Sequence, residues 1–262
     1  MTAKPFSTLK YTAQMLGIIV QLAFSWLLVW LYERNDLRVL GLVPTKERLS
    51  DFLLFFIITA ICCASGFLLK IYFGSLRWEL NPKLTTGLVL EGIRWNLASV
   101  LFEELIFRGV VLYIFIKRLG FTKAILVSAI AFGMYHWFSY GVIGNIGQMA
   151  ITFLLTGTMG LLYAYGYAKT MSLYIPVAIH FGWNFTQSFV FSDGPIGTGI
   201  LKQVGSEPFR TDSYFIFFAA FLLPMLSALF INFYLLKKKK QVAPHIYEGP
   251  HTKAIWQKAA EK

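Results

Sequence analysis

The chain has 262 residues, of which 56% are apolar, 17% aromatic and only 14% charged. This balance is more apolar than that of soluble globular proteins, so a soluble enzyme is excluded. A net charge of +11 would suit nucleic acid, but the Lys and Arg residues lie mainly between and after apolar stretches. There they indicate membrane topology and contact with anionic lipid, with no nucleic acid as partner.

Apolar stretches of about 20 residues recur along the chain, each long enough to cross a hydrocarbon core of about 30 Å as a helix. The sequence therefore predicts an all-α, polytopic transmembrane helical bundle. The expected spans are 11–32, 51–74, 86–117, 122–140, 147–168, 171–191 and 213–236. The third is too long and too charged for one simple crossing, so it is either two helical pieces or a span with an interfacial segment near Lys83. Seven spans is the base count and eight the alternative.

The spans form one predicted domain, 1–236, which is followed by a basic tail, 237–262. With seven spans, fifteen Lys and Arg residues fall on the side of the tail and seven on the other. This excess predicts a multi-pass protein of the plasma membrane with a cytoplasmic tail, and eight spans would bring the N-terminus to that side too. The tail is expected to be a solvated extension whose lysine run, 237–240, lies at the lipid surface. The Gly- and Pro-rich segment 192–212 is expected to be a loop.

Small residues and prolines inside the predicted spans bear on helix packing. Gly160, Ala164 and Ala168 recur every four positions, a spacing that lets two helix backbones approach closely in lipid. Pro176 and Pro224 each lie inside a predicted span, where the missing N–H can kink the helix.

Two adjacent carboxylates, Glu103 and Glu104, lie inside the third span, whereas the other Asp and Glu residues lie in loops, at span ends or in the tail. An acidic residue at the centre of a membrane helix costs about 2.5–3.5 kcal/mol, so the pair needs partners or a water-filled cavity. Arg108 follows Glu104 by four residues on the same helix face and is expected to neutralise it. Glu103 then remains available for chemistry.

Two further spans contribute polar side chains. His136 lies in the fourth span, and His180 and Asn184 lie four residues apart on one face of the sixth. Each of these alone could be a satisfied structural residue or a lock between helices. Together, two carboxylates, an Arg, two His and an Asn from three apolar helices favour a functional cavity over a structural network.

Hydrolysis is the reaction that this set of groups predicts. A Glu and a His can hold and deprotonate a water molecule, while a second His and an Asn can donate hydrogen bonds to the oxyanion of a tetrahedral intermediate. No G-x-S-x-G elbow is present, so attack by water is preferred to a covalent route. Glu103, His136 and His180 are also a suitable ligand set for zinc, although H-E-x-x-H is absent. A metal-free water is favoured, and zinc stays an alternative.

Three short patterns resemble those of a known family. Each places polar residues at a fixed spacing inside an apolar span: E-E-x-x-x-R from Glu103 to Arg108, F-x-x-x-H from Phe132 to His136 and H-x-x-x-N from His180 to Asn184. In this order they resemble the motifs of the CPBP family, the CAAX proteases and bacteriocin-processing (Abi) intramembrane proteases. The resemblance covers about residues 86–190, the expected protease core.

The resemblance implies an intramembrane endopeptidase. One Glu–His pair would activate water, a His–Asn pair would stabilise the oxyanion and a Glu–Arg pair would support them: Glu103 and His136, His180 and Asn184, Glu104 and Arg108. The implied substrates are membrane-associated, namely prenylated CAAX proteins in the eukaryotic branch and bacteriocin-like peptides in bacterial members. For this family a metal-free, glutamate-dependent mechanism is the stronger interpretation.

Two other functions fit the same residues. In an ion-coupled transporter, buried Glu and His would relay protons with Arg108 as a counter-ion, but no inverted repeat is evident and the polar residues form one cluster. In a non-catalytic membrane scaffold the fold would serve partner binding, and a complete motif set argues against this. The expectation is an endopeptidase, with the transporter and the scaffold as alternatives.

Overall fold

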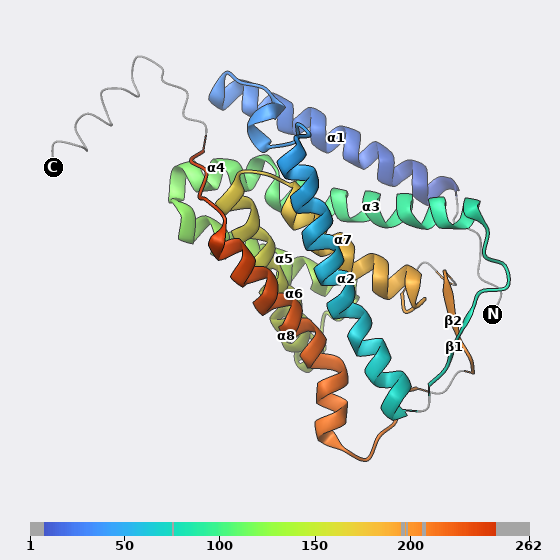
Figure 1. Ribbon diagram of the computed structural model, residues 1–262. Helices are drawn as coiled ribbons and strands as arrows, with labels where there is room; N and C mark the ends of the chain where they lie inside the picture. The colour runs from blue at the N-terminus through green and yellow to red at the C-terminus, as the bar shows by residue number, and fades with distance from the viewer. Residues whose placement is uncertain (1–7, 75, 195–196, 198, 206–207, 245–262) are drawn as a thin grey trace.

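A bundle of α-helices forms almost the whole chain (Figure 1). The computed structural model describes residues 8–74, 76–194, 197, 199–205 and 208–244. In chain order the first half consists of α1 (Thr8–Glu33), the 3-10 helix η1 (Leu37–Leu40), α2 (Lys46–Gly74), β1 (Trp78–Leu80), α3 (Thr86–Arg108), α4 (Val110–Leu119) and α5 (Phe121–Ser139). The second half consists of α6 (Ile146–Thr170), α7 (Tyr174–Phe185), the π-helix η2 (Thr186–Val190), β2 (Leu201–Gln203) and α8 (Tyr214–Lys238).

Each predicted span corresponds to a helix, and the long third span is two helical pieces. The break falls at Gly109, between the end of α3 and the start of α4. A Cβ atom at Gly109 would lie 2.2 Å from the carbonyl oxygen of Leu105, so a side chain there would collide with the preceding turn. Of the two alternatives for this span, the division into two pieces is confirmed.

Four of the described helices are long and apolar enough to cross a membrane. They are the α1 segment Ala13–Glu33, α2, α6 and α8. Helices α4 and α7 have only 10 and 12 residues, and α3 carries the charged cluster. By length and composition, the chain is therefore an integral membrane protein with an all-α bundle, and four of its predicted spans qualify on their own.

Close helix contacts are made where one partner has a small side chain. Helix α5 packs against α6, α2 against α7 and α8, and α1 against α3. A Cβ at Gly66 of α2 would lie 2.9 Å from Pro224 of α8, and one at Gly182 of α7 would lie 2.7 Å from the backbone of Phe56. Gly160, Ala164 and Ala168 all lie on the buried face of α6, as their spacing predicts.

Pro176 and Pro224 occupy different positions within their helices. Helix α7 begins at Tyr174, so Pro176 lies in its first turn, where backbone N–H groups lack intrahelical partners. Pro176 thus lies inside its helix as predicted, but it removes no intrahelical hydrogen bond and gives no reason for a kink, because the helix starts later than the apolar run. Pro224 lies inside α8.

Two features between the helices were not predicted. Strands β1 and β2 pair antiparallel, with Trp78 opposite Gln203, inside what the sequence indicated as plain loops. The start of the tail is also held in place, because Lys239 Nζ lies 2.5 Å from Asp51 and the Val242 amide donates to the carbonyl of Lys169. The rest of the predicted tail, 245–262, lies outside the described residues.

One end of the bundle collects the basic loops. Lys117 of α4 forms an ion pair with Glu33 at the end of α1, and Lys239 does so with Asp51 near the start of α2. Gly41 packs against the backbone of Met171, which joins η1 to the turn between α6 and α7. The segments that the charge count assigns to the tail side therefore share one end of the structure.

Candidate active site

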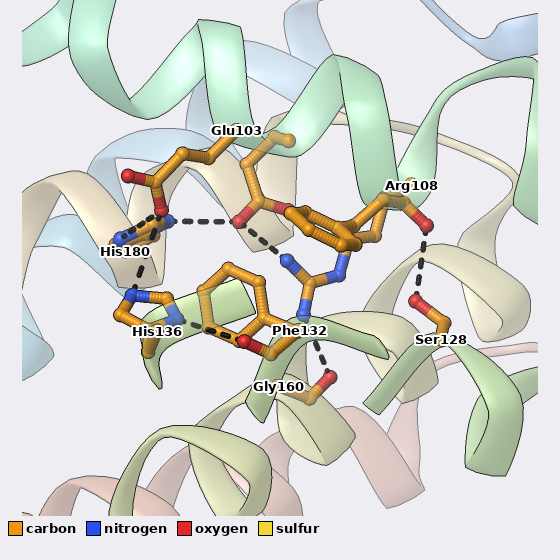
Figure 2. A network of polar contacts seen from close by, with 9 residues as sticks. Glu103, Arg108, Ser128, Phe132, His136, Gly160 and His180 are labelled. Carbon is orange, nitrogen blue, oxygen red and sulfur yellow. Dashed lines mark hydrogen bonds and ion pairs between the residues drawn. The ribbon is translucent and has the colours of Figure 1, made fainter. Parts of the chain in front are cut away.

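Arg108 lies at the centre of a polar network between α3, α5 and α6 (Figure 2). Its fully buried guanidinium donates to Glu104 Oε1 through Nη1 at 3.0 Å and to the Gly160 carbonyl through Nη2 at 3.0 Å. The same group lies 4.1 Å from the centroid of the Phe132 ring. The predicted Glu104–Arg108 pair thus forms, and it carries two further contacts to neighbouring helices.

His180 of α7 is fixed by Glu104. Its Nδ1 lies 2.8 Å from Glu104 Oε1, so this nitrogen donates its proton to the carboxylate. The imidazole stacks on Tyr163 of α6, with centroids 5.0 Å apart and planes 17° from parallel. With Nδ1 occupied as a donor, the neutral ring keeps a lone pair on Nε2.

His136 of α5 is also oriented by a hydrogen bond from Nδ1, in this case to a carbonyl of its own helix. Its Nδ1 donates to the carbonyl of Phe132, four residues earlier, at 2.8 Å. Tyr135 and Tyr140 flank the ring edge to face, the latter with centroids 5.1 Å apart. The Nε2 of His136 is therefore also an acceptor in the neutral ring.

Glu103 is the point on which both imidazoles converge. Its Oε2 lies 3.9 Å from His136 Nε2 and 3.8 Å from His180 Nε2 (Figure 2). These separations are too long for direct hydrogen bonds and match a gap that one water molecule bridges. The Glu103 side chain is 18% exposed, whereas those of Glu104 and Arg108 are fully buried. Glu103 is thus the carboxylate of the pair with any exposed surface, while its Oε2 is buried and makes no hydrogen bond among the described residues.

Gly160 has a role that the sequence did not reveal. A Cβ there would lie 2.8 Å from Phe132 Cδ1 and 3.1 Å from Arg108 Nη2. Its missing side chain therefore admits the guanidinium, and its carbonyl accepts from it. The spacing of small residues predicted that another helix backbone packs closely on this face of α6. At Gly160 the neighbouring group is the buried Arg108 side chain as well.

Tyr163 and Ser128 were also missed as parts of this region. Tyr163 stacks on His180, and the Ser128 hydroxyl donates to the Phe107 carbonyl at 3.0 Å, which ties α5 to the last turn of α3. Aromatic and hydroxyl residues occur in every span, so no sequence signal distinguished these two.

Asn184 lies outside the network that joins the other predicted site residues. It follows His180 by one turn of α7 and is half-buried. Within the described part of the chain its side chain makes no hydrogen bond. The structure therefore brings Glu103, Glu104, Arg108, His136 and His180 together, while the Asn184 amide, one helical turn after His180, makes no hydrogen bond among the described residues.

The alternative zinc site fits in chemistry but not in geometry. Glu103, His136 and His180 offer one carboxylate and two imidazole nitrogens. Ligand atoms about 2.0–2.2 Å from a tetrahedral zinc lie about 3.3–3.5 Å apart, which is closer than the 3.8–3.9 Å between the oxygen and the two nitrogens. Among the described residues no group of three or more His, Cys, Asp or Glu is placed to hold a metal ion.

Comparison with known families agrees with the three sequence patterns. Residues 85–186 match the family described as Type II CAAX prenyl endopeptidase Rce1-like. The matched segment starts at the N-cap of α3 and ends just after α7, so it contains every residue of the network. No curated protein and no solved structure matches the chain. The resemblance to CAAX proteases is therefore confirmed over this segment, and it supports a membrane-embedded protease.

Proposed function

We propose, on the premise that residues 85–186 form a CAAX-protease-like core, that the protein is an endopeptidase acting inside the membrane. The observation that carries this proposal is the convergence of Glu103 Oε2 and the Nε2 atoms of His136 and His180. Glu103 Oε2 and His136 Nε2 can accept the two protons of a water molecule that lies between them, which leaves the lone pairs of the water free to attack.

In the first step, the water is activated. Glu103 accepts one proton from it, while His136 Nε2 accepts a hydrogen bond from its other O–H. The oxygen attacks the carbonyl carbon of the scissile peptide bond, and the carbonyl oxygen becomes the oxyanion of a tetrahedral intermediate. General base catalysis of this kind contributes about 10²–10⁴-fold in rate.

In the second step, His180 and Asn184 stabilise the oxyanion. His180 acts here as an imidazolium, which takes its second proton from solvent before the substrate binds and keeps it through the cycle. Its Nδ1 donates to the Glu104 carboxylate at 2.8 Å, and its Nε2–H donates to the oxyanion. The uncommitted amide of Asn184 provides the second donor. Glu103 then passes its proton to the leaving amine, which restores the carboxylate and completes the hydrolysis.

Glu104 and Arg108 act as positioning residues. Neither side chain is exposed, so neither reaches a substrate. Glu104 Oε1 accepts from both Arg108 and His180, and Arg108 is anchored on Gly160 of α6. Together they fix the imidazole of His180 relative to Glu103.

The topology we propose has seven crossings in a single domain, 1–236. Helices α3 and α4 together form one crossing, because α4 ends beside α1 at the Lys117–Glu33 ion pair. The end that collects the basic loops is cytoplasmic by the positive-inside rule, which places the tail, 237–262, in the cytoplasm of a plasma-membrane protein. Gly160 lies ten residues before the end of α6, or about 15 Å along the helix, roughly half the hydrocarbon thickness.

The proposed substrates are membrane-associated peptides, either prenylated CAAX-type or bacteriocin-like. A site at mid-membrane depth is reached by chains that already lie in or on the bilayer, and the matching family is described by its prenyl endopeptidase activity.

The test is cleavage of a panel of prenylated and unprenylated peptides by the purified full chain in proteoliposomes. Wild type should cleave at least one class, and Glu103→Gln should lose at least about 10²-fold in rate. Glu91→Gln is the matched control, since it makes the same change on the same helix three turns away and should retain activity. Equal rates for wild type and Glu103→Gln would overturn the assignment. Proton uptake by sealed vesicles in place of cleavage would favour the transporter.

A further inference from the structure

A cavity lies at the end of the bundle that collects the basic loops. Its volume is 390 Å³, and its lining comes from the residues before and at the start of α2, the turn between α6 and α7, and the chain after α8. Three of the four long apolar helices begin or end there, namely α2 at Lys46, α6 at Thr170 and α8 at Lys238. Because the ends of such helices mark the edge of the hydrocarbon core, this cavity lies at the level of the lipid headgroups.

Three basic and two acidic side chains line the cavity. Arg48, Lys239 and Lys240 face Glu47 and Asp51, and Asp51 is paired with Lys239 at 2.5 Å. Because Asp51 and Lys239 are paired, the two positive charges of Arg48 and Lys240 are opposed by one negative charge, that of Glu47. Further lysines at the same end of the bundle raise the local positive charge: Lys46, Lys169, Lys237 and Lys238.

Two of the three basic side chains, Arg48 and Lys239, are held by contacts to the walls of the cavity. Arg48 Nη1 donates to the Val43 carbonyl at 2.6 Å, which fixes the guanidinium and leaves its other N–H groups without partners among the described residues. The Val242 amide donates to the Lys169 carbonyl at 2.9 Å, so the chain after α8 crosses the turn that follows α6. The lysines at 239 and 240 are therefore not on a freely solvated tail.

Hydroxyl groups and a helix start complete the lining. Thr45, Thr170, Ser172 and Tyr174 contribute hydroxyls. The first backbone N–H groups of the 29-residue helix α2 add positive partial charge. Fixed guanidinium and ammonium groups, hydroxyls and a helix N-terminus are the donors that bind phosphate in proteins.

We propose that this cavity binds a phosphate group, supplied by the headgroup of an anionic phospholipid. Basic pockets between membrane helices on the cytoplasmic side are suited to such headgroups because charge and location act together. Arg48 and Lys240 provide the charge-assisted contacts to the phosphate, while Asp51 holds Lys239 at the rim. The site is separate from the polar network around Glu103, with which it shares no residue.

The experiment measures thermal unfolding of the purified full chain in a neutral detergent. Short-chain phosphatidylglycerol, short-chain phosphatidylcholine and inorganic phosphate are titrated in separate arms. Phosphatidylglycerol should raise the unfolding midpoint saturably, and the apparent Kd should weaken at least ten-fold in the double variant Arg48→Gln/Lys240→Gln. Lys237→Gln/Lys238→Gln removes the same charge from the same end of the protein outside the cavity, and its Kd should stay within two-fold of wild type.

The outcomes distinguish the sources of the phosphate. An equal rise with inorganic phosphate would assign the cavity to free phosphate and overturn the lipid assignment. An equal loss in both double variants would show non-specific attraction by the basic end, and no rise with phosphatidylglycerol would refute the site altogether. If the Arg48 variant fails to fold, Lys240→Gln alone should still weaken binding, since this side chain forms no hydrogen bond within the described chain. Because unfolding is read without a substrate, the result does not depend on the proposed peptidase activity.

Discussion

Replacing Arg108 by Ala should destabilise the protein more than any surface substitution. The guanidinium is fully buried and bonds to Glu104 Oε1 and to the Gly160 carbonyl, each at 3.0 Å. Removing one partner of a buried ion pair costs about 3–5 kcal/mol, because the remaining charge is left uncompensated. The orphaned Gly160 carbonyl adds about 1–3 kcal/mol. We therefore expect the free energy of unfolding to fall by at least about 4 kcal/mol, from these two contributions.

Equilibrium unfolding in mixed micelles of neutral detergent and dodecyl sulfate measures this change. Arg118→Ala is the matched control, because Arg118 is exposed on α4 and its loss should change stability by no more than about 0.5 kcal/mol. The double variant Glu104→Gln/Arg108→Met removes both charges and should recover much of the loss. A stability for Arg108→Ala within about 1 kcal/mol of wild type would refute the claim that this pair organises the site.

Three further predictions concern the candidate site. Gly160→Ala places a methyl group 2.8 Å from Phe132 and should cost about 1–3 kcal/mol in unfolding free energy, whereas Gly157→Ala, whose nearest contact is 3.7 Å, should cost little. Asn184→Ala should lower kcat by about 10²–10³-fold with KM nearly unchanged, and an equal effect on KM would point to substrate binding instead. His136→Ala should lower kcat by about 10²–10⁴-fold without loss of fold by circular dichroism, and unchanged kcat would remove it from water activation.

Much of the helical architecture was predictable because the signals are local and strong. A run of about 20 apolar residues has few alternatives to a helix in lipid, and each such run contains a helix, of which four are long and apolar enough to cross a membrane. The divided third span was also indicated, since its length and charges did not suit one crossing. The position of the break was not indicated, because the close approach of the Leu105 carbonyl to Gly109 depends on the folded backbone and not on a sequence pattern.

The missed elements depend on contacts between distant segments. Strands β1 and β2 have three residues each, too few for a periodic pattern, and they exist only by pairing with each other. The fixed start of the tail depends on a hydrogen bond between Val242 and Lys169 and on the Lys239–Asp51 pair. Composition alone indicated a solvated extension, because Lys and Pro are equally common in ordered straps and in free tails.

For the candidate site, the spacing of residues within one helix predicted which side chains meet. The orientation of one helix relative to another could not be predicted. The four-residue step from Glu104 to Arg108 placed the two groups in contact, as the structure shows. The proton positions on the imidazoles depend on what faces each Nδ1: a carbonyl one turn earlier for His136, and a carboxylate from another helix for His180. The second of these, which links His180 to Glu104, cannot be read from spacing along the chain.

The most direct test of the central claim is the rate of peptide cleavage by wild type and by Glu103→Gln, each with and without a zinc chelator, on a peptide that the wild type cleaves. We expect the variant to lose at least about 10²-fold in rate and the wild-type rate to be unchanged by the chelator. A variant as fast as wild type would contradict the role of Glu103 as the base. Wild-type activity that the chelator abolishes and zinc restores would contradict the metal-free mechanism and assign Glu103, His136 and His180 as metal ligands.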